Sequence, residues 1–286
     1  MTPVTVIAQT ADGSSAADPT DRTVAADERI RVAATAQERP ASAVLADRTA
    51  VITGGTTGLG RQLAEGFLRA GARVVCGARR DHGVGEIVDR YEDRAAYVPC
   101  DVREPESLER LMAETADRFG GIDIVVANAG ITRNNTVRRL SPEHWREVMS
   151  TNVDGVFHTV RAALPHLERS GSGTVLTVSS AMTSHPAVGA SAYIASKAAI
   201  EAFTRCCAVE FASRRIRVNC LAPGILSVGM GEAVAADERL RQMYWPRLLA
   251  GRQGSAQEAV DAAVFLVSPA ASYVNGHVLD VDGGVL

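Results

Sequence analysis

The chain has 286 residues with a net charge of −3, so it lacks the basic surface that nucleic-acid binding needs. No run of 18 apolar residues occurs, and we predict no membrane-spanning segment. The five cysteines are odd in number and show no C-x-x-C spacing. This argues against disulfide and metal frameworks and favours buried, reduced thiols in a cytoplasmic protein.

The first part of the chain differs in composition from the rest. Residues 1–45 contain no Phe, Trp or Tyr and are rich in Ala, Thr, Asp and Ser. Such a segment buries too little apolar surface to offset its chain entropy, so we predict a mostly disordered arm. It lacks the basic start and apolar core of a secretory signal. A docking or oligomer-contact arm is the alternative. Residues 46–286 are expected to form a single α/β domain.

Apolar runs typical of buried strands alternate with helical patterns from Thr49 onward. We expect strands at residues 49–53, 73–77, 96–100, 122–127, 174–179, 216–221 and 277–281. Helices are expected at residues 58–70, 83–91, 105–119, 142–167, 191–213 and 256–267. Pro105 and Pro142 suit the first helical turn, and Ser141 suits an N-cap. This alternation predicts a doubly wound parallel sheet with helices on both faces.

Residues 228–251 interrupt the alternation and carry Met230, Met243, Tyr244 and Trp245. The segment leaves the carboxyl end of the sixth expected strand, where doubly wound sheets bind their ligands. We therefore predict a substrate lid, with an ordinary pair of surface helices as the alternative.

A glycine-rich turn joins the first expected strand to the first expected helix. Its spacing, G-x-x-x-G-x-G, lets the backbone and the helix N-terminus approach a pyrophosphate. Three later strand ends would lie at the same edge of the sheet, one of which places Asp101 for the adenine amino group. The predicted cofactor residues of the turn and of these ends are Gly54, Thr56, Thr57, Gly58, Leu59, Gly60, Asp101, Val102, Asn128, Ala129, Gly130, Pro223, Gly224 and Leu226.

The end of the second expected strand bears on the choice of cofactor. It carries Arg79 and Arg80, with no acidic residue before Asp81. An acid at this place would hold the ribose 2′-hydroxyl of NAD, whereas a basic residue suits the 2′-phosphate of NADP. The sequence therefore favours NADP(H) over NAD(H). The alternative interpretation is a solvated arginine pair.

Residues 180–197 predict a proton-transfer site. Tyr193 and Lys197 are four residues apart, so they share one face of a helix. An ammonium beside a phenol lowers the phenol pKa from its usual value of about 10. The Ser180 hydroxyl is expected to bond the same reacting oxygen. Proton transfer at that oxygen requires a hydride partner, which the predicted nucleotide site supplies.

Together these motifs resemble the short-chain dehydrogenase/reductase family over residues 46–286. The matching residues include Thr53, Asn128-Ala129-Gly130, Tyr193-x-x-x-Lys197, Pro223-Gly224 and Asp282-Gly283-Gly284. Residues 128–135 and Arg252-Gln253-Gly254 most resemble 3-oxoacyl-[acyl-carrier-protein] reductases. The resemblance implies a Rossmann-type sheet of about seven strands and a homotetramer with helices 142–167 and 191–213 at one interface.

The resemblance also implies a catalytic tetrad of Asn152, Ser180, Tyr193 and Lys197. Tyr193 would be the general acid in carbonyl reduction, and Lys197 would lower its pKa and bind the nicotinamide ribose. Ser180 would polarise the carbonyl. Asn152 would hold a water that links Lys197 to solvent.

Two positions depart from the family pattern. Many NADPH-dependent members carry an arginine where this chain has Thr57, so Arg79 and Arg80, with the Thr56 hydroxyl, would hold the phosphate. Members commonly have a threonine where this chain has Val228, and Ser227 is expected to substitute.

These features predict an NADPH-dependent ketoreductase for a 3-oxoacyl thioester or a polyketide-like ketone. An acyl carrier protein is a candidate partner, with Arg214 and Arg215 as its contact; a solvated helix end is the alternative there. A second hypothesis is an alcohol dehydrogenase that oxidises a sugar alcohol, steroid or similar carbinol. A third is a cofactor-binding sensor without turnover, which the presence of Tyr193 and Lys197 disfavours.

Overall fold

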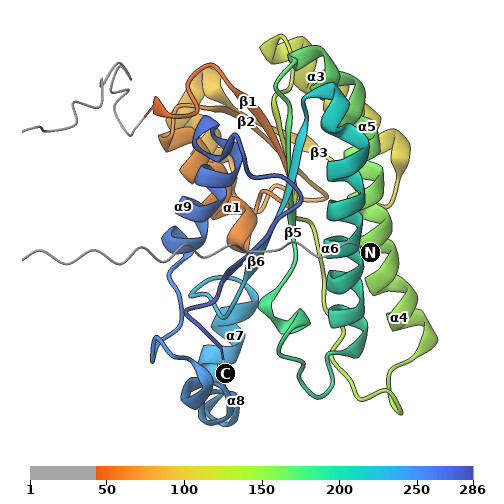
Figure 1. Cartoon of the computed structure of the whole chain (residues 1–286), viewed down its shortest axis with the longest axis vertical. Coiled ribbons are helices and arrows are strands. Elements are labelled where there is room, and N and C mark those ends of the chain that lie inside the picture. The colour runs from red at the N-terminus through yellow and green to blue at the C-terminus, as the bar shows by residue number, and fades with distance from the viewer. Residues whose placement is uncertain (1–42, 286) are drawn as a thin grey trace, which may run out of the picture. The chain divides into compact units, whose positions relative to one another are not determined.

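The computed structural model describes residues 43–285, so residues 1–42 of the arm predicted for residues 1–45 lie outside the described residues. Within that range, seven parallel strands form one sheet in the order β3-β2-β1-β4-β5-β6-β7 (Figure 1). The strands are β1 Thr49–Thr53, β2 Arg73–Ala78, β3 Ala95–Pro99, β4 Ile124–Ala127, β5 Thr174–Val178, β6 Arg217–Pro223 and β7 Val278–Val281. The order reverses between β1 and β4, which opens a crevice at their carboxyl ends.

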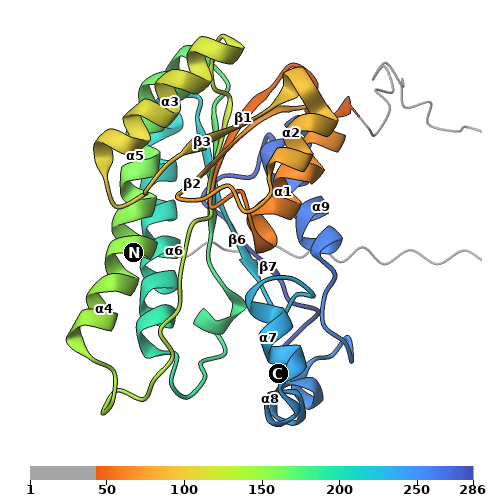
Figure 2. The same cartoon turned by 180° about the vertical axis from the view of Figure 1, so that it is seen from behind.

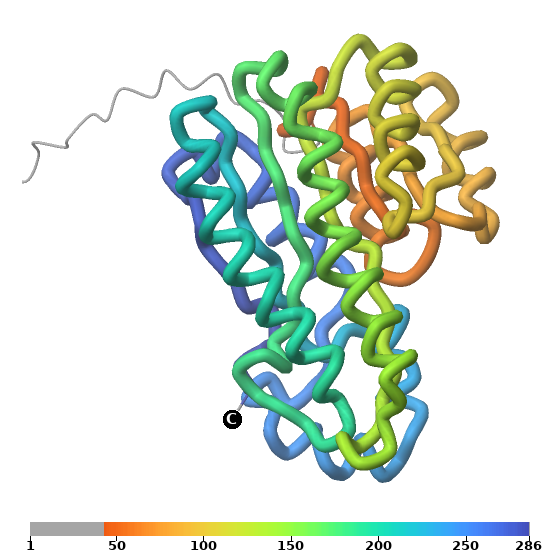
Figure 3. The backbone as a smooth tube through the Cα atoms, turned by 90° about the vertical axis from the view of Figure 1, so that its right-hand side faces the viewer, coloured from red at the N-terminus to blue at the C-terminus, as the bar shows by residue number. Residues whose placement is uncertain are grey.

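Helices cover both faces of the sheet, as the alternating pattern predicts. One face carries α1 Gly58–Arg69, α2 Gly85–Tyr91 and α9 Ala256–Val267. The other carries α3 Pro105–Phe119, α4 Pro142–Met149, α5 Gly155–Ser170 and α6 Ser191–Phe211 (Figures 1 and 2). Two short helices, α7 Met230–Ala236 and α8 Glu238–Tyr244, lie beyond the carboxyl ends of the strands (Figure 3). The predicted α/β fold is confirmed.

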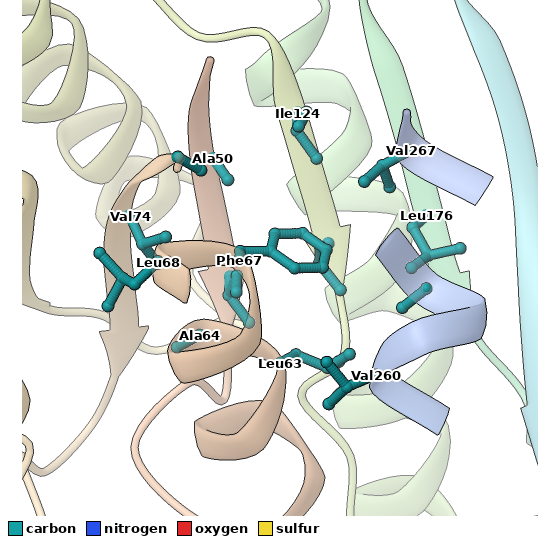
Figure 4. Packing of buried hydrophobic residues seen from close by; sticks show 14 of the residues in the cluster. Ala50, Leu63, Ala64, Phe67, Leu68, Val74, Ile124, Leu176, Val260 and Val267 are labelled. Carbon is teal, nitrogen blue, oxygen red and sulfur yellow. The ribbon is translucent and has the colours of Figure 1, made fainter. Parts of the chain in front are cut away.

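The core on the α1 side forms where α1 and α9 meet over the sheet. Leu63, Phe67 and Val260 are fully buried there, beside the strand residue Ile124 (Figure 4). A Cβ on Gly66 would lie 2.2 Å from Cγ1 of Val260, so the two helices are in close contact. This packing fixes α1, and with it the glycine turn that precedes α1.

The folded part of the chain begins before the predicted boundary at Ala46. Leu45, which we assigned to the arm, is fully buried, and its N–H donates to the Ala70 carbonyl at 2.9 Å. The reason is that this one leucine fills the core beneath the end of α1, whatever the composition of the residues before it. The position of Cys206 also differs from expectation, because it is exposed while the other four cysteines are buried.

The long helix expected at residues 142–167 is interrupted. A π-helical turn, Ser150–Asp154, separates α4 from α5, and Asn152 lies fully buried within it. Single π-turns inside helices often occur at functional sites. No helix among residues 43–285 is long and apolar enough to cross a membrane.

Candidate active site

A cleft of about 990 Å³ runs along the carboxyl ends of the strands and under α7 and α8. It is lined by every residue that the sequence predicts for cofactor binding, together with Ser180. Of the four predicted catalytic residues, Asn152 is the one that does not line the cleft. These residues lie together because the strands are parallel, so that the carboxyl ends of separate strands meet at one edge of the sheet.

The glycine turn between β1 and α1 is built around close backbone approaches. Gly54 and Gly58 have φ values of +66° and +52°, which favour glycine. A Cβ on Gly60 would lie 2.1 Å from the Gly54 carbonyl oxygen. Thr57 is the N-cap of α1, yet its side chain bonds none of the helix amides. The first amides of α1 thus remain able to bind an anion, and the turn fits a dinucleotide pyrophosphate.

Asn128 has a role in this turn that sequence reasoning did not assign. The sequence predicts residues 128–130 only as cofactor residues at a strand end. In the structure, Nδ2 of Asn128 donates to the carbonyl oxygens of Thr53 at 2.9 Å and Gly54 at 3.2 Å. Asn128 therefore holds the glycine turn in place from the neighbouring strand.

The end of β2 presents Arg79 and Arg80 to the cleft, and both are exposed. Among residues 43–285 neither forms an ion pair. Asp101, predicted to meet the adenine, accepts instead from Nε of Arg103 at 3.0 Å. That hydrogen bond lowers the pKa of the Asp101 carboxyl. Arg103 was missed, although an arginine two residues after an acidic residue can fold back onto it.

Tyr193 and Lys197 lie on one face of α6, and both are buried. Nζ of Lys197 donates to the Val178 carbonyl at 2.8 Å and lies 5.6 Å from the centre of the Tyr193 ring. Burial lowers the pKa of Lys197 to about 8. Lys197 is also the only lysine in the chain, a sequence signal that our reading of the motifs missed.

The pKa of Tyr193 differs in direction from the expectation. Burial raises it, and the hydrogen bond with Ser180 opposes that rise. The expected lowering by Lys197 is absent because the ammonium is directed at the Val178 carbonyl and not at the phenol oxygen. A raised pKa keeps the phenol protonated, which is the form a proton donor needs.

Asn152 lies behind the cleft, in the π-helical turn. Its Oδ1 accepts from the Ile131 N–H at 2.8 Å. Its Nδ2 donates to the Ile131 carbonyl at 3.0 Å and to Oγ of Ser196 at 2.9 Å. Both amide hydrogens are thus used, and the second lone pair of Oδ1 is the side-chain group left for the predicted water. These hydrogen bonds hold the loop that follows β4 against α6.

The substrate end of the cleft is mostly apolar. The segment 228–251 contributes Val228, Met230, Val234, Leu240, Tyr244, Arg247 and Leu248 to its wall. The opposite wall includes Met182, His185 and Val188, which follow Ser180 closely and could have been suspected from that position. Ser227 was expected near the carboxamide, but it is exposed and does not line the cleft. Its N–H donates to the Gly254 carbonyl at 2.8 Å, and this hydrogen bond holds the residue away from the cleft.

Comparisons with known proteins identify the family of the chain. A family model described as Enoyl-(Acyl carrier protein) reductase matches residues 54–286. The 3-oxoacyl-[acyl-carrier-protein] reductase of Vibrio cholerae is 35% identical over 241 residues, covering 84% of this chain and 98% of that protein. The predicted resemblance to such reductases is confirmed.

Two solved structures share the fold. A gluconate 5-dehydrogenase from Burkholderia cenocepacia, in complex with NADP and tartrate, is 32% identical with a TM-score of 0.81 and covers 86% of this chain and 98% of that one. A short-chain type dehydrogenase/reductase from Mycobacterium marinum is 33% identical with a TM-score of 0.78, covering 84% and 95%. The chain therefore belongs to the short-chain dehydrogenase/reductase family and is an NAD(P)-dependent oxidoreductase that acts on CH–OH or C=O groups.

Proposed function

We propose that the protein is an NADPH-dependent ketoreductase for a 3-oxoacyl thioester or a polyketide-like ketone. The observation that carries the proposal is that Ser180, Tyr193 and Lys197 line the nucleotide cleft together, with Ser180 near enough to the Tyr193 phenol to lower its pKa. The apolar substrate end favours an acyl chain over a polyhydroxylated sugar.

In this proposal the protein residues bind, orient and protonate. A bound nicotinamide would supply the hydride. Ser180 orients the carbonyl oxygen, and Tyr193 donates the proton that this oxygen takes up. Lys197, whose ammonium is held by the Val178 carbonyl, would bind the ribose hydroxyls of the nucleotide. Asn152 keeps Ile131 and Ser196 in place behind the cleft.

A substrate screen tests the proposal directly. Turnover is measured with 3-oxoacyl thioesters, quinones and steroids, each with NADPH and with NADH, together with an enoyl thioester and gluconate. We expect the highest kcat/KM with NADPH and a 3-oxoacyl or polyketide-like ketone. A preference for gluconate oxidation would favour the alcohol dehydrogenase hypothesis, and reduction of only the enoyl thioester would overturn C=O reduction.

Arg79 is the residue to change for cofactor choice, because it is exposed at the cleft and forms no ion pair among residues 43–285. We expect Arg79→Ala to raise the KM for NADPH by about 10- to 100-fold, since a hydrogen bond to a charged group contributes ~1.5–3 kcal/mol. The KM for NADH should change by less than about threefold. Steady-state kinetics with both nucleotides measure this, with the exposed Arg90→Ala on α2 as control. Equal changes for both nucleotides would contradict the 2′-phosphate assignment.

The segment 228–251 is proposed as the lid over the substrate, since α7 and α8 line the cleft. We propose a carrier-bound substrate as well, but Arg214 and Arg215 are not part of that proposal. Nε of Arg214 is paired with Glu168 at 2.7 Å. Both arginines also lie at the far end of α6 from Tyr193, roughly 30 Å away at 1.5 Å per residue.

We also propose that the protein is a homotetramer. Phe157 on α5 is 45% exposed and Val209 on α6 is 80% exposed, and the Phe157 ring lies edge-on to Phe203 at 6.3 Å. Exposed apolar groups on adjacent helices are typical of a subunit interface. Light scattering after size exclusion should give about four times the mass of the chain. We expect Phe157→Glu to dissociate the tetramer, whereas the exposed Val137→Glu should not.

A further inference from the structure

A third side chain continues the row formed by Tyr193 and Lys197 on α6. Glu201 lies four residues beyond Lys197, so the three share one face of the helix. Oε1 of Glu201 accepts from Oγ of Ser179 and from Oγ1 of Thr183, both at 2.7 Å. Its Oε2 is 3.8 Å from the exposed guanidinium of Arg205. The glutamate side chain is only 14% exposed, so its interactions are made mainly with protein groups.

The two hydroxyls that Glu201 accepts from belong to the segment that carries Ser180. Ser179 precedes Ser180 directly, and Thr183 ends the short 3-10 turn that follows it. The Thr183 N–H donates to the Ser180 carbonyl at 3.0 Å. The single Thr183 hydroxyl hydrogen is given to the closer Glu201 carboxylate, although its Oγ1 also lies 3.0 Å from that carbonyl. The carboxylate therefore fixes the chain on both sides of Ser180.

Residues 178–180, at the end of β5, thus lie along the row of side chains that α6 presents. Lys197 donates to the carbonyl of Val178, Glu201 accepts from Ser179, and Tyr193 lines the cleft with Ser180. Short hydrogen bonds to a carboxylate are stronger than neutral ones. Glu201 is placed to set the distance between Ser180 and Tyr193.

We propose that Glu201 is a positioning residue for the reaction, which acts through Ser179 and Thr183 on Ser180. It touches neither the cofactor-binding turn nor the cleft, so its effect on substrate is indirect. The inference rests on the proposed function, since it assumes that Ser180 orients the substrate carbonyl. A displacement of about 1 Å at such a group can reduce turnover by ~100-fold.

A double-mutant cycle tests the proposal with Glu201→Ala, Ser180→Ala and the combined variant. We expect Glu201→Ala to lower kcat by about 10- to 100-fold, with the Kd for NADPH unchanged. In the Ser180→Ala background the same change should cost less than about threefold, because the residue it positions has gone. Glu201→Gln should retain most of kcat, since its amide oxygen accepts both hydroxyl bonds. Glu210→Gln, on the exposed end of α6, is the matched control.

Two further measurements separate positioning from stability. Removing the same hydrogen bonds from the other side, with Ser179→Ala and Thr183→Val together, should reproduce the loss of kcat even if Glu201→Ala fails to fold. Thermal unfolding is recorded for every variant. A lower Tm with unchanged kcat in Glu201→Ala would overturn the proposal. So would a loss of kcat in the double variant equal to the product of the two single-variant losses.

Failure of the ketoreductase proposal would give results different from failure of the Glu201 proposal. If the wild-type protein reduced no ketone, or if Tyr193→Phe remained active, the ketoreductase proposal itself would be wrong. If those two results come out as proposed but the cycle is additive, only the role of Glu201 is overturned.

Discussion

Tyr193→Phe is expected to reduce kcat by about a thousandfold, within the range that a positioned general acid contributes. The change removes one oxygen from a buried side chain at the cleft wall and leaves the ring packing intact. The Kd for NADPH should therefore stay within about threefold of the wild-type value. Stopped-flow reduction of the ketone and fluorescence titration of NADPH measure the two quantities separately.

A tyrosine outside the site provides the control for this variant. Tyr273 is fully exposed, so Tyr273→Phe should leave both kcat and NADPH affinity unchanged. Wild-type turnover in Tyr193→Phe would remove the phenol from the mechanism and favour another proton donor.

Lys197 is expected to make the stability of the protein depend on pH. Burial lowers its pKa from 10.5 to about 8. Between these values the unfolded chain binds the proton and the folded one does not, so the free energy of unfolding rises with pH across that window. The full gain is about 3 kcal/mol by pH 10.5, from ~1.4 kcal/mol per pKa unit. Below pH 8 the buried ammonium carries its full cost in stability.

The measurement compares wild type with Lys197→Met by urea unfolding from pH 7 to pH 10.5, without added nucleotide. Other groups titrate alike in both proteins, so the difference between the two curves isolates Lys197. The stability of the wild type should increase relative to the variant as pH rises, and parallel curves would contradict the assignment. Turnover of the variant should fall by at least about a hundredfold.

The single lysine makes the same pKa directly observable. Because the chain has no other lysine, selective isotope labelling of lysine side chains gives one resonance that belongs to Lys197. Its chemical shift should titrate near pH 8. Titration near 10.5 would show an ammonium in contact with water.

The sequence predicted the strands and the cleft well because both depend on short local patterns. The apolar run at β1 followed by the Gly54–Gly60 turn identifies a strand end, and parallel strands bring such ends together. The Tyr193–Lys197 spacing likewise defines one helical face without knowledge of the fold.

What the sequence could not predict depends on contacts between distant residues. The role of Asn128 depends on a neighbouring strand, and Leu45 is buried because of where α1 ends. The direction of the Tyr193 pKa depends on burial and on where the Lys197 ammonium points, neither of which spacing reveals. Glu201 was visible as the next residue on the same helical face, but its partners come from the segment that follows β5.

The π-helical turn at Ser150–Asp154 holds about one residue more than an α-helical turn, because its hydrogen bonds run from residue i to i+5. The extra residue is absorbed within the turn, so α4 and α5 continue nearly in phase on either side of it. Deleting one residue there would give a regular, continuous helix, and α4 would still pack against α6. Asn152, however, would lose the position from which its side chain contacts both Ile131 and Ser196. The irregular turn therefore makes room for Asn152, and a more ideal helix would lose the connection between the loop after β4 and α6.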